Sequence, residues 1–173
     1  MLYFAYGSNL SSARLLKRVP SAELVTRGYL TGHLLCFHKV GMDSSGKCNV
    51  FQTGNDRDCV LGAVYRIDAD HKVYLDKAEG LGRGYDEKKV TIYAEPGQML
   101  EVFTYYATNI NDKLKPYHWY KGHVLIGARE HDFPEEYIEM FLSVDSVDDP
   151  YAEREERELS IHGLGLKDGF RTI

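Results

Sequence analysis

The first ten residues constrain this chain most, because an apolar run stops abruptly at a glycine. Residues 1–6 are mostly apolar and aromatic, which predicts a short strand buried on both faces. Residues 7–9 read Gly-Ser-Asn, and a short helical pattern follows over 11–19 and stops at Pro20. A glycine between a strand and a helix lets backbone N–H groups turn outward, and the helix start adds a positive partial charge. We therefore expect the turn at 6–9 to hold a carboxylate or to stabilise a developing oxyanion.

The rest of the chain contains both strand-like and helical patterns. About six strands are expected, mostly joined as hairpins, and the stretches after the first one lie at 24–39, 49–53, 59–67, 85–94 and 100–108. The second and third of these stretches look like the two arms of one hairpin. Helices are expected over 69–78 and 115–129, and Asp132 as the N-cap with Pro134 early in the first turn predicts the start of another. The sequence therefore predicts an α+β fold whose mixed or antiparallel sheet can curl into a small β-barrel.

The length of 173 residues is typical of one domain with a sizeable core. We assign residues 1–150 to that domain. After Pro150 the chain becomes highly charged, and residues 151–173 are interpreted as a charged C-terminal extension of the same domain.

Charge and composition argue against several classes of protein. The formal net charge is −5, which argues against nucleic acid as a partner because phosphate binding needs a basic face. No stretch approaches the ~20 apolar residues of a membrane span, and no signal peptide is recognisable. The three cysteines form no C-x-x-C pair and fit reduced thiols, so we expect a cytoplasmic protein. A monomer or a homodimer is expected.

Two common kinds of catalytic site lack support in the sequence. The histidines include pairs separated by five residues, which suit neither one helix face nor one strand face, so no metal site is expected. Ser8 lacks the second glycine of a G-x-S-x-G nucleophile elbow and has no indicated histidine partner. Glu79 precedes Gly80 at the end of a helical pattern, which places it at the mouth of a loop. Taken alone, such a glutamate is either a solvated helix end or a catalytic carboxylate.

A series of short motifs occurs in order over residues 1–142. It opens with Tyr-Phe-Ala-Tyr-Gly-Ser-Asn-Leu at 3–10, and a glutamate–glycine element at 75–80 is followed by Gly84 and Tyr85. The other motifs lie at 50–52, 61–65, 120–121, 126–130 and 134–137. In these motifs the chain resembles the γ-glutamylcyclotransferases and their wider superfamily. The opening motif and the glutamate–glycine element are fairly specific together, whereas the charged extension takes no part in the resemblance.

The resemblance implies a mixed β-barrel with flanking helices and a site built around one glutamate. By the motifs, the general acid/base of this site is Glu79. The implied substrate-binding residues are Tyr3, Phe4, Ala5, Tyr6, Gly7, Ser8, Asn9 and Tyr120, and the residues expected to line the cavity are Tyr85 and Tyr105. No metal and no organic cofactor is implied.

The reaction implied by the resemblance is intramolecular. The γ-glutamyl group of a small γ-glutamyl amino acid or amine is cyclised to 5-oxoproline, and the free amine leaves. The substrate supplies its own α-amino nucleophile, so the enzyme holds the folded rotamer while a carboxylate moves the proton. Two alternatives stay open: a hydrolase or transferase of γ-glutamyl amides, and a non-catalytic small-molecule binding module on the same fold.

Overall fold

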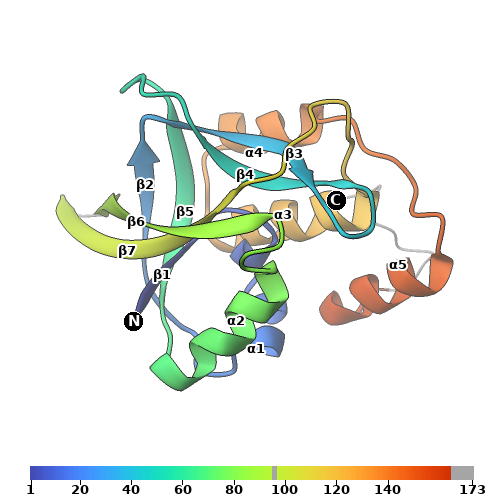
Figure 1. Cartoon of the computed structure of the whole chain (residues 1–173), viewed down its shortest axis with the longest axis horizontal. Helices are drawn as coiled ribbons and strands as arrows, with labels where there is room; N and C mark the ends of the chain where they lie inside the picture. The colour runs from blue at the N-terminus through green and yellow to red at the C-terminus, as the bar shows by residue number, and fades with distance from the viewer. Residues whose placement is uncertain (95–96, 165–173) are drawn as a thin grey trace.

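Five strands close into a barrel in the part of the chain that the structure describes (Figure 1). The structure is a computed structural model, and it describes residues 1–94 and 97–164. The strands around the barrel are β1 (Leu2–Ala5), β5 (Cys59–Arg66), β2 (Glu23–Thr31), β6 (Tyr85–Ala94) and β7 (Gln98–Ala107), in this order. Among the described strands, β1 and β7 pair in parallel and the other neighbours are antiparallel. The predicted α+β fold with a mixed β-barrel is confirmed.

The first strand is buried on both faces, as its sequence predicts. On one side β1 pairs with β5, and on the other side Tyr3 lies opposite Phe103 of β7. Phe4 and Ala5 are fully buried. A Cβ at Gly62 of β5 would lie 2.4 Å from the Phe4 ring, so the glycine leaves the space that this ring fills.

Two further strands form a separate two-stranded sheet, with β3 at His33–Val40 and β4 at Gly46–Gln52. The hairpin expected between 49–53 and 59–67 is therefore wrong, because β4 pairs with β3. The physical reason is that β5 already bonds to β1 along one edge and to β2 along the other. An alternating apolar pattern indicates a strand, but it does not identify the neighbour of that strand.

Five α-helices flank the barrel in the described residues (Figure 1). Their bounds are Ser12–Arg18 for α1, Lys72–Glu79 for α2, His118–Glu130 for α3, Glu135–Ser143 for α4 and Ala152–Leu159 for α5. Short 3-10 turns lie at Ser8–Leu10, Ala69–His71 and Ser160–His162. The helices α1 and α2 lie next to each other, and α3 packs against the first of these turns. None of the described helices is long and apolar enough to cross a membrane.

The start of α4 differs from the expectation. This helix begins at Glu135 with Pro134 at its N-cap position, and Asp132 has a φ of 50° outside the helix. The N–H of Asp132 donates to the carbonyl of Arg129, and its carboxylate accepts a hydrogen bond from Arg27. Asp132 therefore belongs to the turn that ends α3. The expectation that it caps α4 is wrong, because Pro134 stands at that position.

The described part of the charged extension docks onto the rest of the chain through α5. Leu159 is fully buried, and Glu158 forms an ion pair with Arg14 of α1. Residues 165–173 of the predicted extension lie outside the described residues.

The contact between α3 and the turn Ser8–Leu10 generates a first prediction. A Cβ at Gly127 of α3 would lie 2.3 Å from the backbone carbon of Leu10 and from the backbone nitrogen of Ser11. We expect Gly127→Ala to lower the free energy of unfolding by about 1–3 kcal/mol, because two backbones must move apart. Helix propensity alone predicts the opposite sign, a gain of up to about 1 kcal/mol. Urea unfolding measures the difference, and a variant as stable as the parent would contradict the close packing.

Candidate functional site

A small cavity opens beside the end of β1, between α2, α3 and β4. The residues that line it are Tyr3, Tyr6, Gly7, Ser8, Asn9, Cys48, Glu79, Tyr85, Tyr105 and Tyr120. The fold therefore brings the opening motif, the glutamate before Gly80 and three tyrosines from later elements to one place. Sequence reasoning missed Cys48, which enters from the separate sheet and carries no motif of its own.

Two of the predicted binding residues, Phe4 and Ala5, do not line this cavity. Both are fully buried in the barrel, and the carbonyl of Phe4 accepts a hydrogen bond from Thr104 Oγ1 (2.9 Å). The reason is that the opening motif begins inside a strand, whose backbone and side chains are occupied by its neighbours. Their position in the structure is that of core residues.

The carboxylate of Glu79 is anchored through one of its two oxygens. Glu79 is the last residue of α2, and Gly80 ends the helix with a φ of 73°. The side chain is 15% exposed, and its Oε1 accepts hydrogen bonds from Asn9 Nδ2 (2.8 Å) and Arg18 Nη1 (3.0 Å). No such bond reaches Oε2 from the residues that the structure describes. This second oxygen is therefore the one available to a ligand.

The amide of Asn9 fixes the arrangement around this carboxylate. Its Oδ1 accepts a hydrogen bond from Arg18 Nη1 (2.7 Å), and its Nδ2 donates to Glu79 and to the Tyr3 hydroxyl (3.0 Å). Because arginine only donates hydrogen bonds, the amide oxygen must face Arg18. Sequence reasoning missed Arg18, since nothing in the sequence distinguishes it from Lys17, the exposed basic residue before it.

The turn after β1 is pressed against β4. A Cβ at Gly7 would lie 2.9 Å from the Cβ of Cys48, so the approach requires a glycine. The N–H of Leu10 donates to the carbonyl of Gly7 (2.9 Å) and closes the 3-10 turn. N–H groups at the start of such a turn have no partner within it. Those of Ser8 and Asn9 are therefore the candidate donors of this turn for a ligand.

Buried tyrosines form most of the remaining wall. The Tyr6 hydroxyl donates to the carbonyl of Tyr105 (2.7 Å). The Tyr85 hydroxyl donates to the carbonyl of Cys48, and the Tyr120 hydroxyl accepts a hydrogen bond from the Cys48 N–H (3.0 Å). Burial raises the pKa of Tyr6, Tyr85 and Tyr120 well above the ordinary tyrosine value. These phenols stay neutral, so they shape the cavity without adding charge to it.

A second, larger cavity of about 230 Å³ shares Ser8, Glu79, Tyr85 and Tyr120 with the first one. We call the first the inner cavity and the second the outer cavity. The charged residues in the wall of the outer cavity are Arg14, Arg18, Lys39, Asp43, Lys47, Glu79, Arg83, Arg154 and Glu158. They come from separate elements, so local sequence patterns do not bring them together. Among the described residues, no group of histidine, cysteine, aspartate and glutamate side chains is arranged to hold a metal ion.

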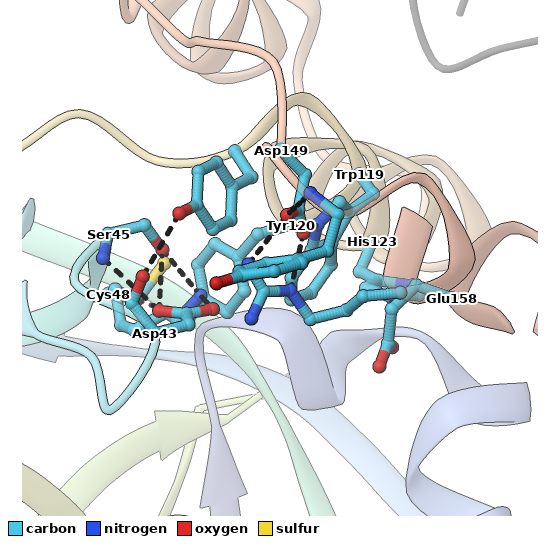
Figure 2. A network of polar contacts seen from close by, with 12 residues as sticks. Asp43, Ser45, Cys48, Trp119, Tyr120, His123, Asp149 and Glu158 are labelled. Atoms are coloured by element: carbon cyan, nitrogen blue, oxygen red, sulfur yellow. Dashed lines mark hydrogen bonds and ion pairs between the residues drawn. The ribbon is translucent and has the colours of Figure 1, made fainter. Parts of the chain in front are cut away.

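Polar contacts tie the β3–β4 loop to α3 along this wall (Figure 2). Lys47 forms an ion pair with Asp43 (2.8 Å), and its ammonium lies 4.5 Å from the centre of the Tyr120 ring and 4.6 Å from that of Trp119. Burial lowers the pKa of Lys47 to about 8, although the ion pair opposes this shift. Trp119 Nε1 in turn donates to Asp149 (2.7 Å), so the loop, α3 and the segment before α5 are joined.

His123 connects α1, α3 and the turn after α5. Its Nε2 lies 2.9 Å from Arg14 Nη1, and its Nδ1 lies 2.7 Å from Nε2 of His162. Burial lowers the pKa of His123 to about 3, and the charge of Arg14 acts in the same direction. His123 is therefore neutral at pH 7.

Comparison with known proteins supports one family for the whole arrangement. A family model described as "AIG2-like family" matches residues 59–141. A Bos taurus protein named "Gamma-glutamylcyclotransferase" is 32% identical over 153 residues, which cover 85% of this chain and 80% of that protein. The Homo sapiens protein of the same name is 31% identical over the same coverage. A solved structure entitled "Gamma-glutamyl cyclotransferase" has a TM-score of 0.82 and 28% identity, and the match covers 94% of this chain and 98% of that one.

The buried His123 generates a prediction on the pH dependence of stability. Its pKa is about 3 in the folded state against an ordinary value of 6.5, so the unfolded state binds more protons between these limits. The stabilisation is therefore complete above pH 6.5 and is lost as the pH falls. From pH 7 to pH 5 we expect a loss of about 2 kcal/mol in the free energy of unfolding from this residue.

The measurement is urea unfolding at pH 7, 6 and 5 for the parent and for His123→Gln. The variant is expected to show the flatter dependence on pH, whatever its absolute stability. Equal slopes for the two proteins would contradict the prediction. Histidines away from this contact contribute equally to both proteins, so the difference between the slopes reports on His123 together with His162, which it touches.

Proposed function

The chain belongs to the γ-glutamylcyclotransferase family, also described as AIG2-like, and on this basis we propose that it is a 5-oxoproline-forming enzyme. Its substrate is a small γ-glutamyl amino acid or amine, and its products are 5-oxoproline and the free amine. The single observation that carries the proposal is the carboxylate of Glu79, which lies in the inner cavity beside the turn Ser8–Leu10. No step of this chemistry requires a group from outside the chain and its substrate.

The reaction forms one bond and breaks another within the substrate. The α-amino nitrogen attacks the γ-carbonyl carbon, a five-membered lactam closes, and the bond from that carbon to the amine nitrogen breaks. Because the nucleophile is already attached to the substrate, the protein chiefly has to hold the folded rotamer. The neutral tyrosines of the inner cavity supply rigid walls for this purpose.

Glu79 has the task of moving the proton. The α-ammonium is not nucleophilic until it loses a proton, and the leaving amine must gain one. Glu79 accepts the first proton and returns it to the leaving nitrogen, with Oε2 as the oxygen that faces the substrate. Asn9 and Arg18 hold Oε1 meanwhile, so the carboxylate keeps its position through both transfers.

The turn after β1 has the complementary task of binding negative charge. In this proposal the N–H groups of Ser8 and Asn9, which line the inner cavity, donate to the carboxylate of the substrate or to the oxyanion that develops on its γ-carbonyl. Gly7 lets this turn lie close against β4, which limits its movement. A preorganised pair of donors of this kind stabilises the transition state without rearrangement.

The direct test is the production of 5-oxoproline by the parent and by Glu79→Gln. We expect the variant to lose about 10²–10⁴-fold in rate, because an amide neither accepts nor returns the proton. Mass spectrometry detects 5-oxoproline after incubation with γ-glutamyl amino acids, γ-glutamyl amines and glutathione. Glu139→Gln is the matched control at an exposed position and should keep full activity. Ligand-induced thermal stabilisation without product, in parent and variant alike, would instead favour a binding module.

A second test concerns Arg18 as the residue that positions Glu79. We expect Arg18→Met to lower kcat roughly 10–100-fold with little change in KM, because a misplaced carboxylate binds substrate but transfers the proton poorly. Arg18→Lys should recover part of this loss, since it restores a cation near Oε1. Lys17→Met removes a charge from the exposed neighbouring position and serves as the control. A loss confined to KM would count against a positioning role.

A further inference from the structure

One buried lysine faces the outer cavity and forms no ion pair with the residues that the structure describes. Lys39 lies on β3 with 5% of its surface exposed, and it lines the same cavity as Glu79. Its ammonium lies 4.5 Å from the centre of the Tyr85 ring. In the described part of the chain, its side chain has neither a hydrogen bond nor an ion pair with another residue. Burying an ammonium without an anion is costly, so such a group points to a partner that arrives from outside.

The other cations of this wall differ from Lys39. Their anionic partners are Glu158 for Arg14, Glu79 for Arg18, Asp43 for Lys47 and Asp149 for Arg154. Arg83 has no ion pair among the described residues either, but it is exposed and needs none. Lys39 is thus the buried cation of the wall whose charge the described residues leave uncompensated at short range.

The backbone next to Lys39 leaves room for its ammonium. A Cβ at Gly84 would lie 3.1 Å from Lys39 Cε and 3.4 Å from its Nζ, and Gly84 has a φ of 123° that disfavours other residues. The side chain of Lys39 is therefore held between Gly84 and the Tyr85 ring. Tyr85 also lines the inner cavity, so the ammonium lies at the junction of the two cavities.

The charge of the outer cavity is opposite in sign to that of the whole chain. Among the described residues, six cationic side chains and three carboxylates line this cavity, whereas the chain carries a formal net charge of −5. A locally positive cavity on an acidic protein attracts anionic ligands and orients them. Burial lowers the pKa of Lys39, and the attraction of Glu79 and Asp43 opposes this effect, so a bound anion would add to their influence.

We propose that Lys39 binds a side-chain carboxylate on the amine half of the substrate, so that the preferred leaving group is an acidic amino acid. This inference rests on the proposed function, which places the γ-glutamyl half in the inner cavity and the amine half in the outer one. Lys39 then acts as a specificity residue, and the ion pair that it forms replaces water around both charges. A neutral amine half of the same size leaves the ammonium uncompensated and binds less well.

The matched substrates for the test are γ-glutamyl-glutamate and γ-glutamyl-glutamine, which have nearly the same size and differ in one charge. We expect the parent to favour the glutamate compound by about tenfold or more in kcat/KM. Lys39→Met should reduce this preference to nearly one, chiefly by lowering kcat/KM for the glutamate compound. Lys39→Arg should keep part of the preference, and Lys113→Met, which removes an exposed charge, should keep all of it.

Two results would overturn the proposal: equal use of both substrates by the parent, or an equal loss for both in Lys39→Met. A failure of the proposed function is recognised separately, because neither compound then yields 5-oxoproline with the parent. In that event the changes in Tm caused by free glutamate and by free glutamine test whether Lys39 binds a carboxylate, because this measurement needs no turnover. Greater stabilisation by glutamate that disappears in Lys39→Met supports the anion site, and equal stabilisation by the two amino acids overturns it.

Discussion

The barrel closes through a strand of only four residues, and the site depends on this closure. Because β1 bonds to β5 along one edge and to β7 along the other, its end cannot shift independently of the barrel. The chain then enters the turn Ser8–Leu10, which packs closely against Cys48 on one side and Gly127 on the other. Asn9 is thereby held where its amide meets Glu79. The position of the carboxylate thus follows from how the sheet closes on itself.

Features that depend on neighbours along the chain could be predicted from the sequence. The end of the first strand at Gly7 and the end of α2 at Gly80 are local events, because a glycine changes what the backbone can do at that point. The β6–β7 hairpin is also local, since its strands are adjacent in sequence. Local patterns alone did not show that the opening motif and Glu79 lie in one cavity. The resemblance to a family predicted it.

Features that depend on contacts between distant segments could not be predicted. The partner of β4 is β3 because the barrel occupies both edges of β5, and no local pattern records that competition. In the sequence Arg18 and Lys39 look like ordinary basic residues. Only the fold shows that Arg18 lies beside Glu79 and Lys39 beside Tyr85. The prediction that Asp132 caps α4 is wrong for the same reason, because Asp132 is part of the turn that ends α3. Each of these outcomes is decided by packing rather than by propensity.

The contacts that build the two cavities span very different lengths of chain. The barrel closes when Tyr3 meets Phe103, and the inner cavity is complete once Tyr120 is in place. The outer cavity needs in addition the ion pair of Arg14 with Glu158. A chain leaves the ribosome with its N-terminus first, so these surfaces become available in that order. During synthesis the residues of the inner cavity are therefore all available before the wall of the outer cavity can be completed.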